Sequence, residues 1–126
     1  MVKALVVEDE EDIRNPLVEQ LLDKGCEVRR ADNGAVALMR VSEEIPDIIF
    51  VDIVMPVMDG ILFVAELRGN PVTARIPVVL VSAITLPGPR ERATMLGGNH
   101  FMAKPWDGET LDRMLQVNDE WKIPSG

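Results

Sequence analysis

Asp52 has the clearest potential for chemistry in this chain, because it directly follows the unbroken apolar segment 48–51. Pro56, Asp59 and Gly60 then supply turn signals. An apolar run bounded by turn residues is typical of a strand buried on both faces, as in a parallel sheet. Ligands of such sheets bind at the carboxyl ends of the strands. Asp52 is therefore a candidate functional carboxylate, and a capping or turn aspartate is the alternative.

Polar residues also end other apolar segments of the chain. They are Glu8 and Asp9 after residues 3–7, Ser82 at the end of residues 76–82, and Lys104 after residues 99–103. Carboxylate, hydroxyl and ammonium groups would form one site if the fold brought these strand ends together.

Apolar and turn residues alternate in a way that predicts five strands, each followed by a helix. The strands are expected at residues 3–7, 26–31, 48–51, 76–82 and 99–103. The helices are expected at residues 12–24, 35–44, 61–67, 90–96 and 107–117. The alternation implies right-handed crossovers and an α/β fold with a doubly wound five-stranded parallel sheet. We expect the flavodoxin-like strand order 2-1-3-4-5, with the switch point between the first and third strands.

Four residues mark features of the expected helices. Gly25 should end the first helix, and Asp59 and Asp107 should cap the third and the last. Pro16 removes a backbone donor inside the first helix, so we expect that helix either to start late or to kink.

The expected strand order would make Glu8 and Asp9 face Asp52. Two carboxylates about 4 Å apart repel by roughly 4 kcal/mol at an effective dielectric constant near 20. A hard divalent ion with oxygen ligands would relieve this repulsion, and Mg²⁺ suits a site with only a few carboxylates. With Lys104 and Ser82 at the neighbouring strand ends, the group predicts a site for a phosphoryl group, where catalysis depends on positioning and charge neutralisation.

Size and charge exclude several other classes of protein. The chain has 126 residues, 47% of them hydrophobic, and a single cysteine, Cys26, which excludes an internal disulfide. No apolar run approaches the roughly 20 residues of a membrane span. The net charge of −8, without a basic cluster, argues against a nucleic-acid-binding surface. We expect one domain over residues 1–126, without a signal peptide, in the cytoplasm.

The chain resembles the receiver domain of two-component response regulators over essentially its whole length, and in particular the single-domain regulators of chemotaxis. Five pieces carry the resemblance, and they occur in order at the spacing of that family. They are Val6-Val7-Glu8-Asp9-Glu10, Asp32-Asn33-Gly34, residues 46–60, Val81-Ser82-Ala83 and Lys104-Pro105. Any one piece alone would be weak, whereas the ordered set is specific.

The resemblance implies that Asp52 is the phosphoacceptor. It would receive a phosphoryl group from a histidine of a sensor kinase or a phosphotransfer protein, or from a small phosphodonor. Asp9, Asp52 and the backbone carbonyl of Val54 would bind Mg²⁺ directly, and Glu8 would bind it through water.

The resemblance also implies a conformational switch. Lys104 and Ser82 would contact the phosphoryl oxygens, and Phe101 would turn inward as Ser82 moves. Tyrosine is common at that position in the family, and phenylalanine lacks its hydroxyl anchor. A downstream protein would read the change on the face built from the fourth helix, fifth strand and fifth helix, and a homodimer is left open.

Each of these residues also has a simpler interpretation. Taken alone, Ser82 is more typical of a strand-end serine bonded to the backbone, and Phe101 of a core residue. Lys104 could be a surface lysine, but the lysine-proline step after an apolar strand favours a place in the site. Trp106 fits either simple packing or an exposed contact face, and the sequence does not separate the two. Cys26 has no partner at ligand spacing and is expected to pack in the core.

Two rival functions fit the residues poorly. A phosphatase of the haloacid dehalogenase type needs a second aspartate two residues after the nucleophile, where this chain has Val54. A nucleotide-binding module needs a glycine-rich phosphate loop after the first strand, where this chain has acids. We therefore expect a stand-alone signalling switch that is not an enzyme. The alternatives are a pseudo-receiver that binds partners without phosphorylation, and the excised receiver of a longer regulator with an output domain.

Overall fold

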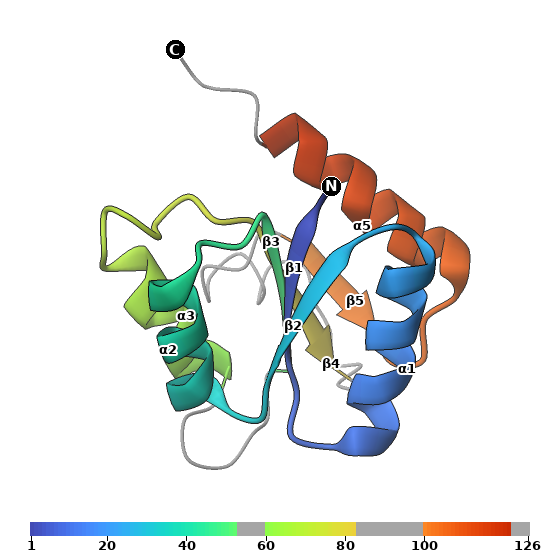
Figure 1. Ribbon diagram of the computed structural model, residues 1–126, viewed down its shortest axis with the longest axis horizontal. Coiled ribbons are helices and arrows are strands. Elements are labelled where there is room, and N and C mark those ends of the chain that lie inside the picture. Colours follow the sequence, from blue (N-terminus) through green and yellow to red (C-terminus); the bar gives the residue numbers. More distant parts are fainter. Residues whose placement is uncertain (53–59, 83–99, 122–126) are drawn as a thin grey trace, which may run out of the picture.

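Five parallel strands form one sheet in the computed structural model, which describes residues 1–52, 60–82 and 100–121 (Figure 1). In chain order the strands are β1 (Lys3–Val7), β2 (Glu27–Ala31), β3 (Ile48–Asp52), β4 (Val78–Ser82) and β5 (His100–Ala103). They pair in the order β2-β1-β3-β4-β5, and every pairing is parallel. The predicted strand order is confirmed.

Helices cover both faces of this sheet. α1 (Glu11–Asp23) and α5 (Gly108–Trp121) lie on one face, and α2 (Gly34–Glu43) and α3 (Gly60–Arg68) lie on the other (Figure 1). The arrangement is the predicted doubly wound α/β fold. Among the described helices, none is both long and apolar enough to cross a membrane. The predicted fourth helix, residues 90–96, and the predicted cap Asp59 lie outside the described residues.

Alternating side chains of the central strands supply the two halves of the core. The half beneath α2 and α3 contains the strand residues Leu5, Val7, Ile49, Val51, Val78 and Leu80. The half beneath α1 and α5 contains Ala4, Val6, Ile48, Phe50, Val79 and Val81. β3 is buried along its whole length, as its apolar sequence predicts. Even-numbered residues of β1 and β3 therefore face α1 and α5.

α1 begins at Glu11, ahead of Pro16, so the predicted late start of this helix is wrong. The backbone N–H groups of Ile13 and Arg14 donate to the Glu10 carbonyl at 3.1 and 2.8 Å. This turn forms before the proline is reached, and Pro16 removes only one donor. The buried face of α1 outweighs that loss, because packing supplies most of the stability of a helix. The alternative, a kink at Pro16, stays a prediction.

Gly25 ends α1 as predicted. Its φ of +86° is a left-handed conformation that favours glycine. The N–H of Gly25 donates to the Leu22 carbonyl and that of Cys26 to the Leu21 carbonyl, each at 3.0 Å. These two bonds form a Schellman motif, which stops the helix and turns the chain toward β2.

Asp107 caps α5, as predicted. Its Oδ1 accepts a hydrogen bond from the Thr110 N–H at 2.7 Å. That backbone hydrogen bond holds the pKa of Asp107 below its ordinary value. The helix continues to Trp121, beyond its expected end at residue 117.

Candidate functional site

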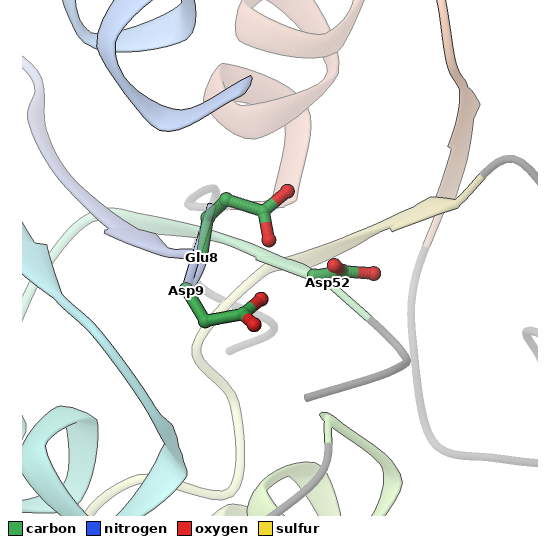
Figure 2. Close-up of side chains that lie close together, drawn as sticks. All are labelled: Glu8, Asp9 and Asp52. Carbon is green, nitrogen blue, oxygen red and sulfur yellow. The ribbon is translucent and has the colours of Figure 1, made fainter. Parts of the chain in front are cut away.

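Three carboxylates lie together at the carboxyl edge of the sheet (Figure 2). Glu8 and Asp9 directly follow β1, and Asp52 is the last residue of β3. Each offers one oxygen, and these oxygens lie within 4.8 Å of one another. Glu8 and Asp52 are buried, with 3% and 6% of their surface exposed, and Asp9 is partly exposed. The structure thus brings together the three carboxylates that the sequence singled out.

The strand register explains why Glu8 meets Asp52. Val7 pairs with Val51 across β1 and β3, so the next residue along each strand lies beside its counterpart. Glu8 and Asp52 also continue the even-numbered series whose side chains face α1 and α5. The alternation of side chains along each strand points both carboxylates to the same side of the sheet, and the register of β1 and β3 brings them next to each other.

Lys104 supplies a positive charge to this acidic cluster. It follows β5, and its Nζ donates to Glu8 Oε1 at 2.8 Å and to Asp52 Oδ2 at 3.2 Å. Its side chain is 15% exposed, so both ion pairs are partly shielded from water. This position favours the site interpretation of Lys104 over that of a surface lysine.

One ammonium group does not balance three carboxylates. Burial raises the pKa of Glu8 from 4.5 to about 8; Asp52 adds to the rise and Lys104 opposes it. Burial alone would lower the pKa of Lys104, but its hydrogen bond to Glu8 and the nearby negative charges raise it, so the ammonium stays charged. Without a further cation, the raised pKa of Glu8 therefore favours its protonated form.

Two carboxylate oxygens of the cluster have no hydrogen-bond partner among the described residues. They are Glu8 Oε2 and Asp9 Oδ1, and both atoms are buried. Buried polar atoms are normally paired with a donor or a cation. Hard oxygen donors at this spacing suit Mg²⁺, which few carboxylates hold while it keeps several waters. The residues present therefore fit a divalent cation.

Comparison with known proteins identifies the family. The family model of the response regulator receiver domain matches residues 4–116. The chain belongs to this family. The matched residues include the three carboxylates of the acidic cluster and Lys104. The resemblance that the sequence motifs indicate is confirmed.

Curated relatives are response regulators and related proteins. The receiver is 37% identical to response regulator PleD of Caulobacter vibrioides over 121 residues, which are 96% of this chain and 27% of PleD. It thus spans about a quarter of the length of that relative. It is 31% identical to Protein PilG of Pseudomonas aeruginosa over 87% of this chain and 82% of PilG. Membership of the family implies phosphorylation-dependent signalling in a two-component system.

Solved receiver structures share the fold. The chemotaxis response regulator CheY4 of Vibrio cholerae has a TM-score of 0.85 at 32% identity, covering 94% of this chain and 98% of that one. The receiver domain of sensor histidine kinase PA1611 from Pseudomonas aeruginosa has a TM-score of 0.84 at 29% identity, covering 92% and 95%. That receiver has a magnesium ion coordinated in its active site cleft.

Some predicted site residues of this receiver fall outside the described part. Val54 does so entirely, and for Ser82 and Phe101 only the backbone is described. Ser82 ends β4, and its neighbour Val81 pairs with Asp52. The backbone therefore places Ser82 at the same edge of the sheet as the acidic cluster, while the switch roles of Ser82 and Phe101 stay predictions.

Trp106 both packs and lines a groove. It contacts the core half beneath α1, and its Nε1 donates to Gln20 Oε1 on α1 at 2.7 Å. Together with Pro16 and Lys104 it lines a groove of about 500 Å³ beside the site. The packing interpretation of Trp106 is confirmed, and its role in a contact face stays a prediction. Cys26 is buried, as expected.

Arg14 of α1 is a residue that the sequence analysis missed. It is buried, and its Nη1 donates to the Glu8 backbone carbonyl at 3.2 Å and to Asp32 Oδ1 at 2.5 Å. A signal was present, because Arg14 lies three and four positions before the buried Leu17 and Val18. Arg14 thus occupies the apolar stripe of the helix, where a charged residue is rarely found without a partner.

Proposed function

We propose that this receiver is a phosphorylation-dependent switch in which Asp52 accepts a phosphoryl group. The observation that carries the proposal is the environment of Asp52, a buried carboxylate grouped with Glu8 and Asp9. The ammonium of Lys104 lies 3.2 Å from its Oδ2. A phosphoryl group on Asp52 would lie among charges suited to its oxygens.

The donor is a phosphohistidine of a sensor kinase or a phosphotransfer protein, or a small phosphodonor. A carboxylate oxygen of Asp52 attacks phosphorus, and the new O–P bond replaces the N–P bond of the phosphohistidine. The electron pair of that bond stays on the imidazole nitrogen, which takes up a proton from water as the ring leaves. Lys104 neutralises charge on the transferred oxygens, which is the main demand of phosphoryl transfer. The Ser82 hydroxyl would donate a hydrogen bond to the same oxygens.

Asp9, Asp52 and the backbone carbonyl of Val54 would hold Mg²⁺ directly, and Glu8 would hold it through water. When bound, the ion neutralises the carboxylates and the oxygens of the incoming phosphoryl group. The unpaired buried oxygens of Glu8 and Asp9 support this assignment. The magnesium ion in the cleft of the PA1611 receiver supports it as well.

The phosphorylated receiver would act by binding and not as an enzyme. A downstream protein that prefers one state shifts the equilibrium between the states and thereby reads phosphorylation. We propose that this downstream protein binds to the face formed by the predicted fourth helix, β5 and α5. Ser82 and Phe101 would couple that face to the phosphoryl group.

Incubation with a small phosphodonor and Mg²⁺ tests the phosphoacceptor. Intact mass should show one added acid-stable, base-labile phosphoryl group on the wild-type protein and none on Asp52→Asn. Asp112→Asn is the matched control, because it alters an exposed aspartate of α5, and it should be labelled like wild type. Labelling that persists in Asp52→Asn, or that maps to His100, would overturn the assignment.

A further inference from the structure

The Arg14 side chain contacts the acidic cluster at the backbone carbonyl of Glu8. The Arg14 side chain is 11% exposed, and its Nη1 is shared between the Glu8 carbonyl oxygen and Asp32 Oδ1. Its Nη2 lies 3.7 Å from Glu11 Oε1. The guanidinium therefore joins the Glu8 carbonyl to the carboxylate of Asp32, which follows β2, and it also lies near Glu11 in the same turn of α1.

These contacts close a ring around the peptide groups of Glu8. The Glu8 N–H donates to the Ala31 carbonyl at 3.0 Å, and Ala31 is followed directly by Asp32. Arg14 Nη1 donates a hydrogen bond to Asp32 and another to the Glu8 carbonyl, which closes the ring. Glu8 lies just beyond the last residue of β1. The ring thus holds the peptide between Glu8 and Asp9 at the point where the strand ends.

We propose that Arg14 is a positioning residue for the divalent-cation site, an inference that rests on the proposed function. By holding the Glu8 carbonyl, Arg14 sets the direction in which the chain leaves β1. The carboxylates of Glu8 and Asp9 converge with that of Asp52 from this direction (Figure 2). Loss of this donor would leave the buried Glu8 carbonyl unsatisfied, and a rotation of the peptide that relieves this cost would move Asp9 with it.

Arg14 acts through geometry and not through its charge. Asp32 and Glu11 lie beside the guanidinium and offset its positive charge, so we expect it to add little to the field at Asp52. Groups that orient metal ligands without touching the metal typically change metal affinity by about 10- to 100-fold when they are removed. An effect of that kind separates a positioning role from a purely structural one.

Arg14→Met tests the proposal, because methionine keeps an apolar stem and removes the donors. Titration calorimetry should show a dissociation constant for Mg²⁺ at least about tenfold higher than that of wild type. In metal-free protein, the amide resonances of Glu8 and Asp9 should shift as well. This second measurement needs no bound ion.

Arg29→Met is the matched control. Arg29 Nη1 also donates to a backbone carbonyl, that of Arg40 at 2.9 Å, and its Nη2 donates to Glu43 Oε1 at 2.6 Å. These contacts join β2 to α2 and do not reach the acidic cluster. Arg29→Met should therefore keep the wild-type affinity for Mg²⁺, even if it loses as much stability as Arg14→Met.

Arg14→Lys separates positioning from stability. Lysine keeps a positive charge for Asp32 but lacks the planar guanidinium, whose Nη1 contacts both the Glu8 carbonyl and Asp32 while Nη2 lies near Glu11. We expect this variant to fold and to bind Mg²⁺ more weakly than wild type, and it decides the question alone if Arg14→Met does not fold.

Wild-type affinity in a folded Arg14 variant would overturn the proposal, as would an equal loss of affinity in Arg29→Met. If the wild-type protein itself binds no Mg²⁺, the proposed function fails. The metal-free resonances of Glu8 and Asp9 then still decide whether Arg14 positions them.

Discussion

Burial and charge conflict most strongly at Glu8. Only 3% of its surface is exposed, and Lys104 lies 2.8 Å from its Oε1. Its pKa is nevertheless raised to about 8, because burial penalises the carboxylate, Asp52 adds to the penalty, and Lys104 shares one charge between two partners. A proton on Glu8 and a divalent cation in the cluster are therefore alternative ways to relieve the same excess of negative charge.

The stability of the metal-free receiver should fall as pH rises. The folded-state pKa of Glu8, about 8, lies above its ordinary value of 4.5. Between these values the folded protein binds more protons than the unfolded chain, so the free energy of unfolding decreases with pH. Glu8→Gln resembles the protonated carboxyl and should gain about 1–2 kcal/mol relative to wild type between pH 5 and pH 8. Denaturant unfolding without Mg²⁺ measures this difference.

Glu19→Gln is the control for this pH dependence, because Glu19 is exposed on α1. Its free energy of unfolding should follow that of wild type at every pH. Saturating Mg²⁺ should flatten the wild-type profile. A constant difference between wild type and Glu8→Gln across the range would mean that Glu8 is ionised throughout.

At the scale of elements, the ends of α1 connect the core to the site. Its first turn begins at Glu11, two residues after Asp9, and carries Arg14, which donates a hydrogen bond to the Glu8 carbonyl. Its last turn closes with the Schellman motif at Gly25, which leads the chain into β2. Each end therefore fixes where a neighbouring strand begins or ends.

Gly25→Ala should lower the free energy of unfolding by about 1 kcal/mol, because alanine is strained at positive φ. Steric crowding does not contribute to this loss of stability, since a Cβ at Gly25 meets no atom within 4 Å. Gly108 is the matched control: it has equal room for a Cβ and no positive φ, and it begins α5. Gly108→Ala should be neutral or stabilise by up to about 1 kcal/mol. Denaturant unfolding that gives both variants the same loss would contradict this account of Gly25.

At the scale of the whole molecule, the groups proposed for phosphoryl chemistry lie at one edge of the sheet. Asp52 ends β3, Ser82 ends the adjacent β4, and Lys104 follows β5. β5 thus connects the proposed site directly to the face on which we expect a partner to bind. Couplings between two such sites typically amount to about 1–3 kcal/mol.

A beryllofluoride mimic of the phosphoryl group should therefore perturb the backbone amides of residues 100–106 more than those of α1 and α2. Ser82→Ala should reduce this perturbation, because it removes the hydroxyl proposed to follow the phosphate, while Asp52 still accepts a phosphoryl group. Ser42→Ala changes an exposed serine of α2 and should leave the perturbation intact. Amide resonances recorded with and without the mimic measure the effect, and changes confined to residues that touch Asp52 would contradict it.

Much of this architecture could be predicted without coordinates. The strands and helices follow from apolar runs and turn residues, and the strand order follows from the usual arrangement of doubly wound sheets. That order places Glu8 and Asp9 beside Asp52. The caps at Gly25 and Asp107 follow equally from residue type. The individual elements and caps are local, since each depends on a few neighbouring residues, and parallel strands in this order bring their carboxyl ends to one edge.

Other features required the packed molecule. The sequence predicted Lys104 at this edge of the sheet, but its hydrogen bonds to Glu8 and Asp52, and the burial that raises the pKa of Glu8, exist only in the packed site. α1 begins before Pro16 because its apolar face packs on the sheet, which a rule about proline does not include. Arg14 is paired because α1 lies against the ends of β1 and β2. Burial and long-range contacts set the energies of these groups, and both exist only once the chain has folded.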